Sequence, residues 1–505
     1  MASLIWIPLL LPAIIAPTAW WRRGDRWTRG ADLAVAAVAL GTGIALLATV
    51  HASGPLSAGA VLRADALSAW LLTTIGAVAV TALWGGLATK ETRADPDGRY
   101  TALICLFLGA MSLAVLSDNL GILWVAIEAT TIATAFLVGH RQSPGSLEAA
   151  WKYVVLGSVG VAIAFLGIVL LYASTVAAGS PTLSWVELAD GGIPLDPDLT
   201  RVAVALSVLG FATKAGLAPM HSWLPDAHSQ APAPVSGLMS GVLLSVALYA
   251  ILRIQAVGDA SLGPAFLRGL LLAGALLSLA VAAGMILAQR DYKRMLAYSS
   301  IEHMGIMALG VAVGGPLATA AVLLHMLGHG LVKAAMFVVA GRILASEGST
   351  RTLDVAGLLT RRPDLARPLL VGTAALLGFP PFVLFFTEVA IIIAGWRADL
   401  GWAMGIALVL LLIVFAGLTR HVLAMTLGPQ VGSAPLHRTS LEALPEVERA
   451  RSLDASPQKP DEKYVASHRQ APVLVALGVA ALLGLLATPL AAQLIEAASV
   501  LAGAR

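Results

Sequence analysis

The sequence predicts an all-α polytopic membrane protein with about fourteen transmembrane helices, two inverted five-helix repeats and discontinuous seventh and twelfth helices. Composition is the first support: 58% of the 505 residues are hydrophobic, 12% are charged and the mean hydropathy is +0.84. A soluble chain would carry about 25% charged residues. Apolar runs near the ~20 residues that cross a bilayer recur from end to end. This recurrence excludes a signal peptide followed by a soluble domain.

The apolar runs predict the individual spans, with boundaries that are accurate to a few residues. In chain order they cover residues 3–20, 32–51, 66–88, 100–117, 119–138, 149–174, 201–224, 230–256, 264–288, 295–314, 316–342, 366–397, 401–427 and 470–495. The fourth and fifth spans nearly touch at Asp118-Asn119, and the tenth and eleventh at Gly314-Gly315. Such short connections favour antiparallel helix pairs.

Basic residues predict the orientation of the spans. Most lysines and arginines outside the spans lie in loops that follow odd-numbered spans. The other loops hold Arg63, Arg201, Arg253, Arg268 and Arg397. Because cytoplasmic loops are enriched in Lys and Arg, both termini are predicted to lie on the outer side of a bacterial cytoplasmic (inner) membrane.

Several classes of cofactor and partner are disfavoured. The single Cys105 excludes an internal disulfide and an iron–sulfur cluster held by this chain alone. No basic patch with interleaved aromatic residues indicates nucleic acid. We therefore expect no cofactor bound by this chain. Residues 428–469 form the one stretch that reads as soluble, and we interpret it as a polar cytoplasmic loop.

Two spans carry proline breaks. The seventh has Lys214 before Pro219, and the twelfth reads GFPPFVLFFTEVAI, with Pro380 and Pro381 before Glu388. Paired interruptions five spans apart predict two related units. The predicted divisions are N-terminal helices 1–3 (1–99), a first repeat of helices 4–8 (100–256), a second repeat of helices 9–13 (264–427), the loop 428–469 and a last helix in 470–505.

Ionisable residues at bilayer depth are functional candidates by default, because burying them is costly. The set within the predicted spans is Glu128, Lys214, Glu302, His303, His325, His329, Lys333 and Glu388. His325, His329 and Lys333 recur every four residues and so share one helix face. Three titratable groups on one stripe favour a water-lined path over packing alone.

Each candidate also has a simpler interpretation. Glu128 could be a neutral carboxyl beside Thr130 or Thr131, and Lys152 could extend to the membrane surface. Zinc could bind His325 and His329, but the HExxH glutamate is absent and no third ligand is evident, so we predict no metal site. Three further residues could be ordinary residues at the membrane interface or could form the entrance of a proton pathway: His221, Asp226 and His228.

The chemistry of this set is proton transfer. Burial lowers the pKa of a lysine and raises that of a glutamate towards neutral pH, and histidine already titrates there. A broken helix adds unpaired backbone groups, room for water and a hinge. The predicted relay consists of Glu128, Lys214, His325, His329, Lys333 and Glu388.

Five segments resemble a known family, the antiporter-like proton-translocating subunits of complex I, Mrp antiporters and membrane-bound hydrogenases. They are LGILWVAIEATT, FATKAGLAPMHSWLPDAHSQAPAPVSGLMSGVLL, DYKRMLAYSSIEHMGIM, HMLGHGLVKAAMF and GFPPFVLFFTEVAI, between about residues 117 and 400. YSSIEHMG and EAAWKYVVLGS look most like the F subunits of hydrogenase-4-type complexes.

The resemblance implies roles for particular residues. Glu128, Lys214 and Glu388 match the family's ionisable positions on helices five, seven and twelve, and His325 and His329 match those on helix eleven. Many members carry lysine or histidine on helix eight, where this chain has Ser245. A serine can hold water but stores no proton at neutral pH. Either water bridges Lys214 to the helix-eleven histidines, or the relay is interrupted.

These features predict a proton-translocating membrane subunit of a multisubunit redox complex. It would resemble the hydrogenase-4 or formate hydrogenlyase membrane arm, or complex I, and would have no redox chemistry of its own. Its expected partners are other subunits of that complex and the lipid bilayer. The alternatives are an Mrp-type cation/proton antiporter subunit, the membrane partner of a carbon dioxide-hydrating complex, and an anchor that no longer conducts.

Overall fold

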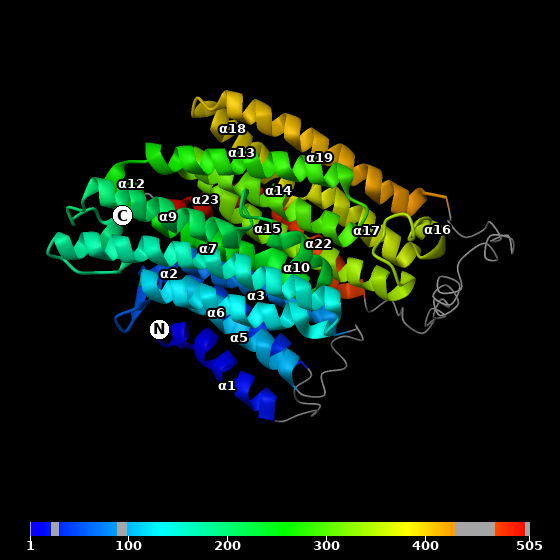
Figure 1. The fold of residues 1–505 in the computed structure, drawn as a ribbon, viewed down its shortest axis with the longest axis horizontal. Coiled ribbons are helices and arrows are strands. Elements are labelled where there is room, and N and C mark those ends of the chain that lie inside the picture. The colour runs from blue at the N-terminus through cyan, green and yellow to red at the C-terminus, as the bar shows by residue number, and fades with distance from the viewer. Residues whose placement is uncertain (1, 22–29, 88–97, 430–469, 500–505) are drawn as a thin grey trace.

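A computed structural model of the chain describes residues 2–21, 30–87, 98–429 and 470–499. These residues form long helices that lie side by side along one direction (Figure 1). Large apolar side chains such as Leu10, Ile14 and Phe136 are exposed around the outer helices. Helices that are apolar all round are typical of a membrane-embedded bundle. The predicted fold class, an all-α polytopic membrane protein, is confirmed.

The first half of the described chain contains one small antiparallel sheet. Its strands are β1 (Leu56–Ala58) and β2 (Leu62–Ala64). The helices of this half are η1 (Ala2–Trp6), α1 (Ile7–Trp21), α2 (Ala31–Ser53), α3 (Ala66–Gly86), α5 (Arg99–Leu116), α6 (Leu120–Val138), η2 (Gly139–Arg141), α7 (Pro144–Ala177), α8 (Trp185–Ala189), α9 (Pro197–Ala215), α10 (Trp223–Gln230), α11 (Ala233–Leu238), the π-helical η3 (Met239–Leu243) and α12 (Leu244–Leu262).

The second half is helical in all its regular elements within the described residues. These helices are α13 (Ala265–Ala288), α14 (Tyr292–Val313), α15 (Gly315–Glu347), α16 (Leu358–Arg361), α17 (Pro363–Leu376), α18 (Val383–Arg397), α19 (Gly401–Leu427), α22 (Ala471–Leu485) and α23 (Ala487–Ser499).

The predicted spans coincide with these helices. Eleven helices in the described residues are long and apolar enough to cross a membrane. The other three predicted spans correspond to the helix pairs α9–α10, α17–α18 and α22–α23. The count of fourteen, the two inverted repeats and the domain divisions remain predictions. The predicted loop 428–469 lies outside the described residues from position 430 onward.

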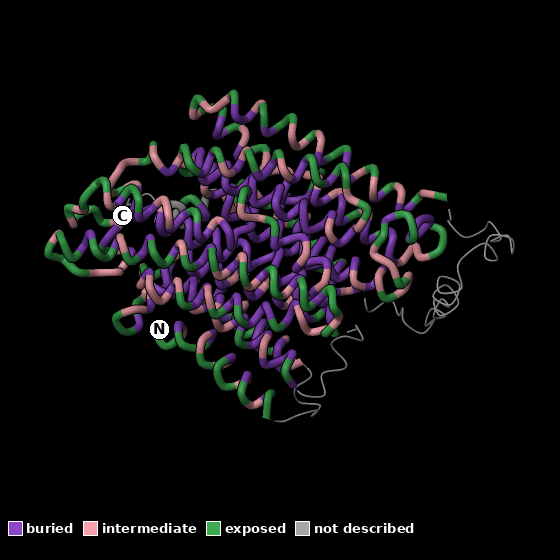
Figure 2. The backbone as a smooth tube through the Cα atoms, in the orientation of Figure 1, coloured by how far each residue is buried: buried purple, intermediate pink, exposed green. Residues whose placement is uncertain are grey.

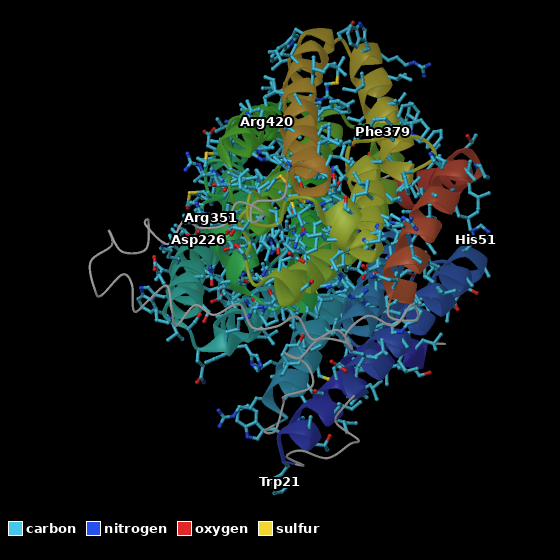
Figure 3. The ribbon with its side chains drawn as sticks, turned by 90° about the vertical axis from the view of Figure 1, so that its right-hand side faces the viewer. Trp21, His51, Asp226, Arg351, Phe379 and Arg420 are labelled. Atoms are coloured by element: carbon cyan, nitrogen blue, oxygen red, sulfur yellow. The ribbon has the colours of Figure 1, made fainter. Side chains whose placement is uncertain are left out.

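Three helical stretches are enclosed by the others: the continuous helix over 233–262, α14 and α15. Figure 2 shows this buried centre surrounded by helices with exposed outer faces. The view along the helices in Figure 3 places α1 and α2 at one side of the bundle and α18 and α19 at the other. The titratable residues of α14 and α15 therefore lie far from lipid.

One predicted loop residue is placed differently. Arg253 was expected in a loop after the eighth span, but it lies inside α12 and is fully buried. Its Nη2 contacts both oxygens of Asp65 at 2.8 Å, and its guanidinium lies 3.7 Å from the ring centroid of Trp185. The prediction was wrong because α12 continues to Leu262, and because an acid from α3 offsets the cost of the buried charge.

The two helix breaks have the same backbone design. Gly216 and Gly378 both adopt positive φ, 72° and 64°. The next residue donates its N–H to the carbonyl five positions back, Leu217 to Ala212 and Phe379 to Ala374. This is a glycine-terminated helix end, which satisfies carbonyls that the helix leaves free. Each break continues through a cis peptide bond before proline, at Ala218-Pro219 and at Pro380-Pro381.

Candidate functional site

Lys214 lies in the last turn of α9, directly before the first break, and is fully buried. Its Nζ donates to the Tyr153 hydroxyl at 2.6 Å and lies 4.3 Å from the centroid of that ring. A helix C-terminus favours a positive charge. Trp223 closes the site from the other side of the break, because its Nε1 donates to Thr213 O at 2.8 Å. The first break thus positions Lys214 among aromatic side chains.

Glu128 is close to this site without pairing directly with Lys214. Its carboxylate accepts from Ser158 Oγ at 2.9 Å and from Thr131 Oγ1 at 3.2 Å. Among the described ion pairs, none joins Glu128 to Lys214. Tyr153 links the two regions, since it holds Lys214 and contacts Thr134 Oγ1 at 2.6 Å. Glu128 is partly exposed on α6, whereas Lys214 is enclosed.

His228 occupies the position between the two halves of the site. Its ring centroid lies 6.3 Å from that of Trp223 and 5.5 Å from that of Phe337, one turn beyond Lys333 on α15. Both ring nitrogens are buried and have no hydrogen-bond partner in the described part of the chain. Buried polar groups of this kind normally bind ordered water. The structure therefore places a titratable group between Trp223, beside Lys214, and Phe337, one turn from Lys333.

Ser245 follows the π-helical turn η3 and is buried, and its Oγ has no partner among the described residues. The turn packs tightly on α15, since a Cβ at Gly241 would lie 2.8 Å from Gly330 O. Ser240 within it contacts Ser300 Oγ at 2.7 Å. Such π-turns are frequent at functional sites. The helix thus carries hydroxyl groups to the face of α14.

Lys333 is held by α14. Its Nζ donates to Leu296 O at 2.8 Å and to the Ser299 hydroxyl. Glu302 lies one turn further along α14 and interacts electrostatically with Lys333, with no direct ion pair between them. Glu302 Oε2 lies 3.5 Å from His303 Nε2. Both Glu302 and His303 are therefore part of the buried cluster.

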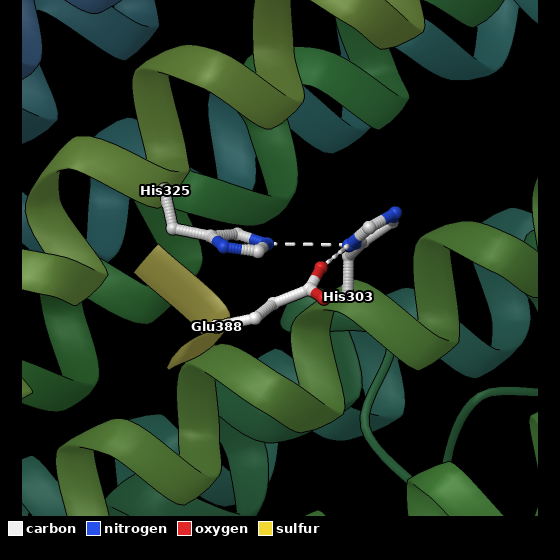
Figure 4. Close-up of side chains that lie close together, drawn as sticks. All are labelled: His303, His325 and Glu388. Atoms are coloured by element: carbon white, nitrogen blue, oxygen red, sulfur yellow. Dashed lines mark hydrogen bonds and ion pairs between the residues drawn. The ribbon is translucent and has the colours of Figure 1, made fainter. Parts of the chain in front are cut away.

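The second break brings three helices together around His303, His325 and Glu388 (Figure 4). His303 Nδ1 lies 3.2 Å from His325 Nε2 and 4.0 Å from Glu388 Oε1. His329 lies beside them, with its ring tilted by 52° and its centroid 5.0 Å from that of His303. Gly378 allows this approach, because a Cβ there would lie 2.7 Å from Glu388 Oε2. The sequence could not show this convergence, since the residues come from α14, α15 and α18.

The remaining candidates, Lys152, His221 and Asp226, lie outside this cluster. Asp226 of α10 pairs with Lys152 at 3.3 Å and with Arg294 at 3.0 Å. Figure 3 shows Asp226 at the end of the bundle that faces the viewer, on the same side as Arg351. Lys152 also pairs with Glu148 and is about half exposed. His221 lies within the first break, between α9 and α10.

Sequence reasoning missed several contacting residues. Tyr153, Ser158 and Thr387 are polar side chains on apolar helices, and each binds one of the predicted site residues. Tyr153 lies in the segment EAAWKYVVLGS. A helical projection of α7 could have indicated it, because it is a polar side chain on a largely apolar helix. Thr387 precedes Glu388 and gave no separate signal. Asp65 was also missed, because nothing local indicates its buried partner Arg253.

The arrangement is a file of titratable groups between two partly exposed acids. Buried Lys214, His228, Lys333, His329, His325 and His303 lie between Glu128 on α6 and Glu388 on α18. Figure 1 places α6 and α18 on opposite sides of the bundle.

Residues 117–414 match the model of the family described as NADH:quinone oxidoreductase/Mrp antiporter, transmembrane. The chain belongs to this family.

Individual relatives agree with this membership. A protein named hydrogenase-4 component F homolog from Methylacidiphilum infernorum is 41% identical over 292 residues, which are 57% of this chain and 61% of that relative. NADH-quinone oxidoreductase subunit N from Desulforudis audaxviator is 32% identical, with 72% of this chain and 74% of the relative covered. The chain therefore spans about three fifths of the length of the first relative and about three quarters of the second.

Solved structures share the fold over nearly the whole chain. A subunit of the archaeal membrane-bound sulfane sulfur reductase superposes with a TM-score of 0.85 at 24% identity, covering 99% of this chain and 97% of its own. A subunit of the Mrp complex from Dietzia sp. DQ12-45-1b gives 0.83 at 22% identity, covering 99% and 97%. The predicted family resemblance is confirmed.

Proposed function

We propose that this family member moves protons across a bacterial cytoplasmic membrane as one subunit of a multisubunit redox complex of the hydrogenase-4 or complex I kind. The observation that carries the proposal is the buried file from Lys214 through His228 and Lys333 to the histidines of α14 and α15. Such residues are rare inside membranes and indicate ion or proton paths.

The proposed path has two hydrated sections joined at the buried centre. Lysine and histidine exchange protons with water, and a proton file needs groups that both accept and donate. His228, between Trp223 and Phe337, meets that need, whereas Ser245 does not. His221, Ser245 and Glu302 border the path and would hold water. Moving one charge against ~100 mV costs about 2.3 kcal/mol, so a redox partner must drive the transfer.

Partner subunits are proposed at both sides of the bundle. Glu128 and Glu388 are the two acids of the file that remain partly exposed in the isolated chain. A carboxylate facing lipid is unfavourable. Neighbouring subunits that cover α6 and α18 would remove that exposure. The named relatives, a hydrogenase component and a quinone oxidoreductase subunit, support partners of this class.

Copurification followed by a transport assay tests the proposal. The intact complex is purified through a tag on this chain, its subunits are identified, and proton uptake into vesicles is measured for wild type and Lys214→Ala. We expect redox subunits in the complex and a loss of about 100-fold in coupled proton movement, the scale of a lost proton-transfer group.

The outcome also separates the alternatives. Redox subunits with unchanged pumping in Lys214→Ala would contradict the path. Copurifying antiporter subunits with sodium-coupled proton exchange would indicate the Mrp alternative, and a zinc-containing hydratase would indicate the carbon dioxide-hydrating complex. Either result would overturn the proposed redox partner.

A further inference from the structure

The cluster around His303, His325 and Glu388 has the donor set of a transition-metal site. Two imidazole nitrogens and one carboxylate oxygen converge from α14, α15 and α18, all within 4.8 Å of one another (Figure 4). Zinc is bound by this combination of ligands in proteins. We propose that these three side chains bind one Zn²⁺ ion in the centre of the second half of the bundle.

The distances between the donor atoms support this assignment. Ligands at about 2.05 Å from a tetrahedral zinc ion lie about 3.3 Å from each other. His303 Nδ1 and His325 Nε2 are 3.2 Å apart, so the two nitrogens already have the spacing that the ion requires. Glu388 Oε1 is 4.0 Å from His303 Nδ1, and the three donor atoms lie within 4.8 Å of one another, so the Glu388 carboxylate must move inward by roughly 1 Å. Its side chain is 18% exposed and can turn.

His325 is oriented by a hydrogen bond at its other nitrogen, and His303 has the Glu302 carboxyl beside its other nitrogen. Thr387 Oγ1 donates to Leu384 O at 2.9 Å, so its lone pair accepts from His325 Nδ1 at 2.8 Å. His325 then presents an unprotonated Nε2 to the centre of the cluster. His303 Nε2 lies 3.5 Å from Glu302 Oε2 without a hydrogen bond between them, and its Nδ1 faces the centre. Outer partners that donate or accept in this way hold zinc-binding histidines in position.

A fourth ligand is available on α15. His329 lies one turn from His325, with ring centroids 6.3 Å apart, and is fully buried. Both of its nitrogens lack a hydrogen-bond partner in the described residues. Rotation of this ring or a bound water would complete four-fold coordination.

Binding requires a change of tautomer at His303. In the metal-free cluster, His303 Nδ1–H is assigned as the donor in the 3.2 Å contact with His325 Nε2, because His325 Nδ1 donates to Thr387. On binding, the Nδ1–H bond breaks and an Nε2–H bond forms on the side of Glu302, so His303 remains a neutral imidazole. One Zn–N bond then forms at each facing nitrogen and one Zn–O bond forms at the Glu388 carboxylate, and zinc keeps its oxidation state.

Titration of the purified full-length protein tests the site without any transport assay. Zn²⁺ is added to wild type and the single variants His303→Gln, His325→Gln and Glu388→Gln, with Co²⁺ absorption reporting the coordination geometry. We expect wild type to bind one equivalent more than His303→Gln or His325→Gln, with two imidazole ligands visible by X-ray absorption. The exposed His51→Gln is the matched control and should retain that equivalent.

Thr387 provides a variant that leaves all ligands in place. Thr387→Val keeps the shape but removes the acceptor for His325 Nδ1, and loss of such a partner weakens zinc binding by about 10- to 100-fold. Thr387→Ser should restore the wild-type affinity. Equal zinc stoichiometry in wild type, His303→Gln and His325→Gln would overturn the proposal, as would equal affinity in Thr387→Val.

The site rests on the donor geometry, and its three ligands are also residues of the proposed proton path. If protons pass through His303 and His325, bound Zn²⁺ should block them, and Thr387→Val should need a higher zinc concentration for the block. Zinc bound at this site with undiminished proton movement would support the metal site and contradict that path.

Discussion

At the residue scale, Tyr153 determines where the ammonium of Lys214 lies. The phenol oxygen accepts from Nζ at 2.6 Å, and the ring face lies 4.3 Å from the same atom. These two contacts confine a charge that no described carboxylate pairs with directly. The Tyr153 hydroxyl also reaches Thr134. Lys214 is thus connected to α6 through a chain of hydroxyl groups rather than through an ion pair with Glu128.

We predict that Tyr153→Phe slows coupled proton movement by about tenfold, because a hydrogen bond to a charged group contributes about 1.5–3 kcal/mol. The aromatic ring and its packing remain. Proton uptake into vesicles at matched protein levels measures the effect. Tyr172→Phe, on the same helix but 42% exposed, is the control and should leave the rate unchanged. Equal rates for the two variants would show that the hydroxyl does not position Lys214.

At the element scale, the two helix breaks share the same backbone conformation but position different ionisable side chains. Lys214 precedes the first break by two residues, and Glu388 follows the second by about two turns of helix. Ser278 Oγ accepts from Ala218 N at 2.8 Å and so satisfies the first break from α13. At the second break, α22 approaches so closely that a Cβ at Gly484 would lie 1.9 Å from Pro381 O. Each break is thus enclosed by a neighbouring helix.

We predict that Gly378→Ala destabilises the protein and displaces Glu388. A residue with a Cβ costs about 1–2 kcal/mol at positive φ, and this Cβ would also lie 2.7 Å from Glu388 Oε2. Thermal unfolding of the purified protein should show a lower midpoint, together with slower proton movement.

The control for that variant is Gly284→Ala, in the exposed face of α13 with open space around it. Alanine there should raise helix stability by about 0.5–1 kcal/mol. A Gly378→Ala protein as stable and as active as Gly284→Ala would contradict the role given to the second break.

At the scale of the whole molecule, the Asp65–Arg253 pair joins the N-terminal end of α3 to α12, beside Trp185 of α8. Both side chains are fully buried. Removing one partner of a buried pair typically costs about 3–5 kcal/mol, because the other charge is left without compensation. We therefore predict that Asp65→Asn lowers the thermal unfolding midpoint strongly.

The exposed pair Arg201–Asp198 is the matched comparison, and Asp198→Asn should change stability by less than about 1 kcal/mol. A double variant, Asp65→Leu with Arg253→Met, should recover part of the loss, since an apolar pair of similar volume leaves no charge unpaired. If Asp65→Asn and Asp198→Asn unfold at the same temperature, the buried pair does not stabilise the bundle.

The orientation in the membrane is also a whole-molecule prediction. In a Cys105→Ala background, Ser180→Cys lies in an exposed loop on the proposed outer side, and Leu353→Cys lies in one on the proposed cytoplasmic side. An impermeant maleimide added to intact cells should label only Ser180→Cys. Labelling of Leu353→Cys alone would reverse the orientation and place both termini in the cytoplasm.

The membrane-embedded helical class, the family and most candidate residues could be inferred from local features of the amino-acid sequence. Apolar runs, proline breaks and ionisable residues within spans are local features, and bilayer thickness and desolvation act on them wherever the helices pack. Lys214 and Glu388 were identifiable for this reason. Both breaks could be located from Pro219 and Pro380, although their shared glycine geometry could not.

Which of these residues contact one another depends on how the helices pack, and it could not be inferred from the sequence. The placement of His228 between Trp223 and Phe337, the contact of Tyr153 with Lys214, and the convergence of His303, His325 and Glu388 each join helices far apart in the chain. A hydrophobic pattern tells which face of a helix is apolar, but in a bundle buried on all sides it does not select the neighbouring helix. Packing of small residues such as Gly241 against Gly330 makes that selection, because close backbone approach fixes which polar side chains face each other.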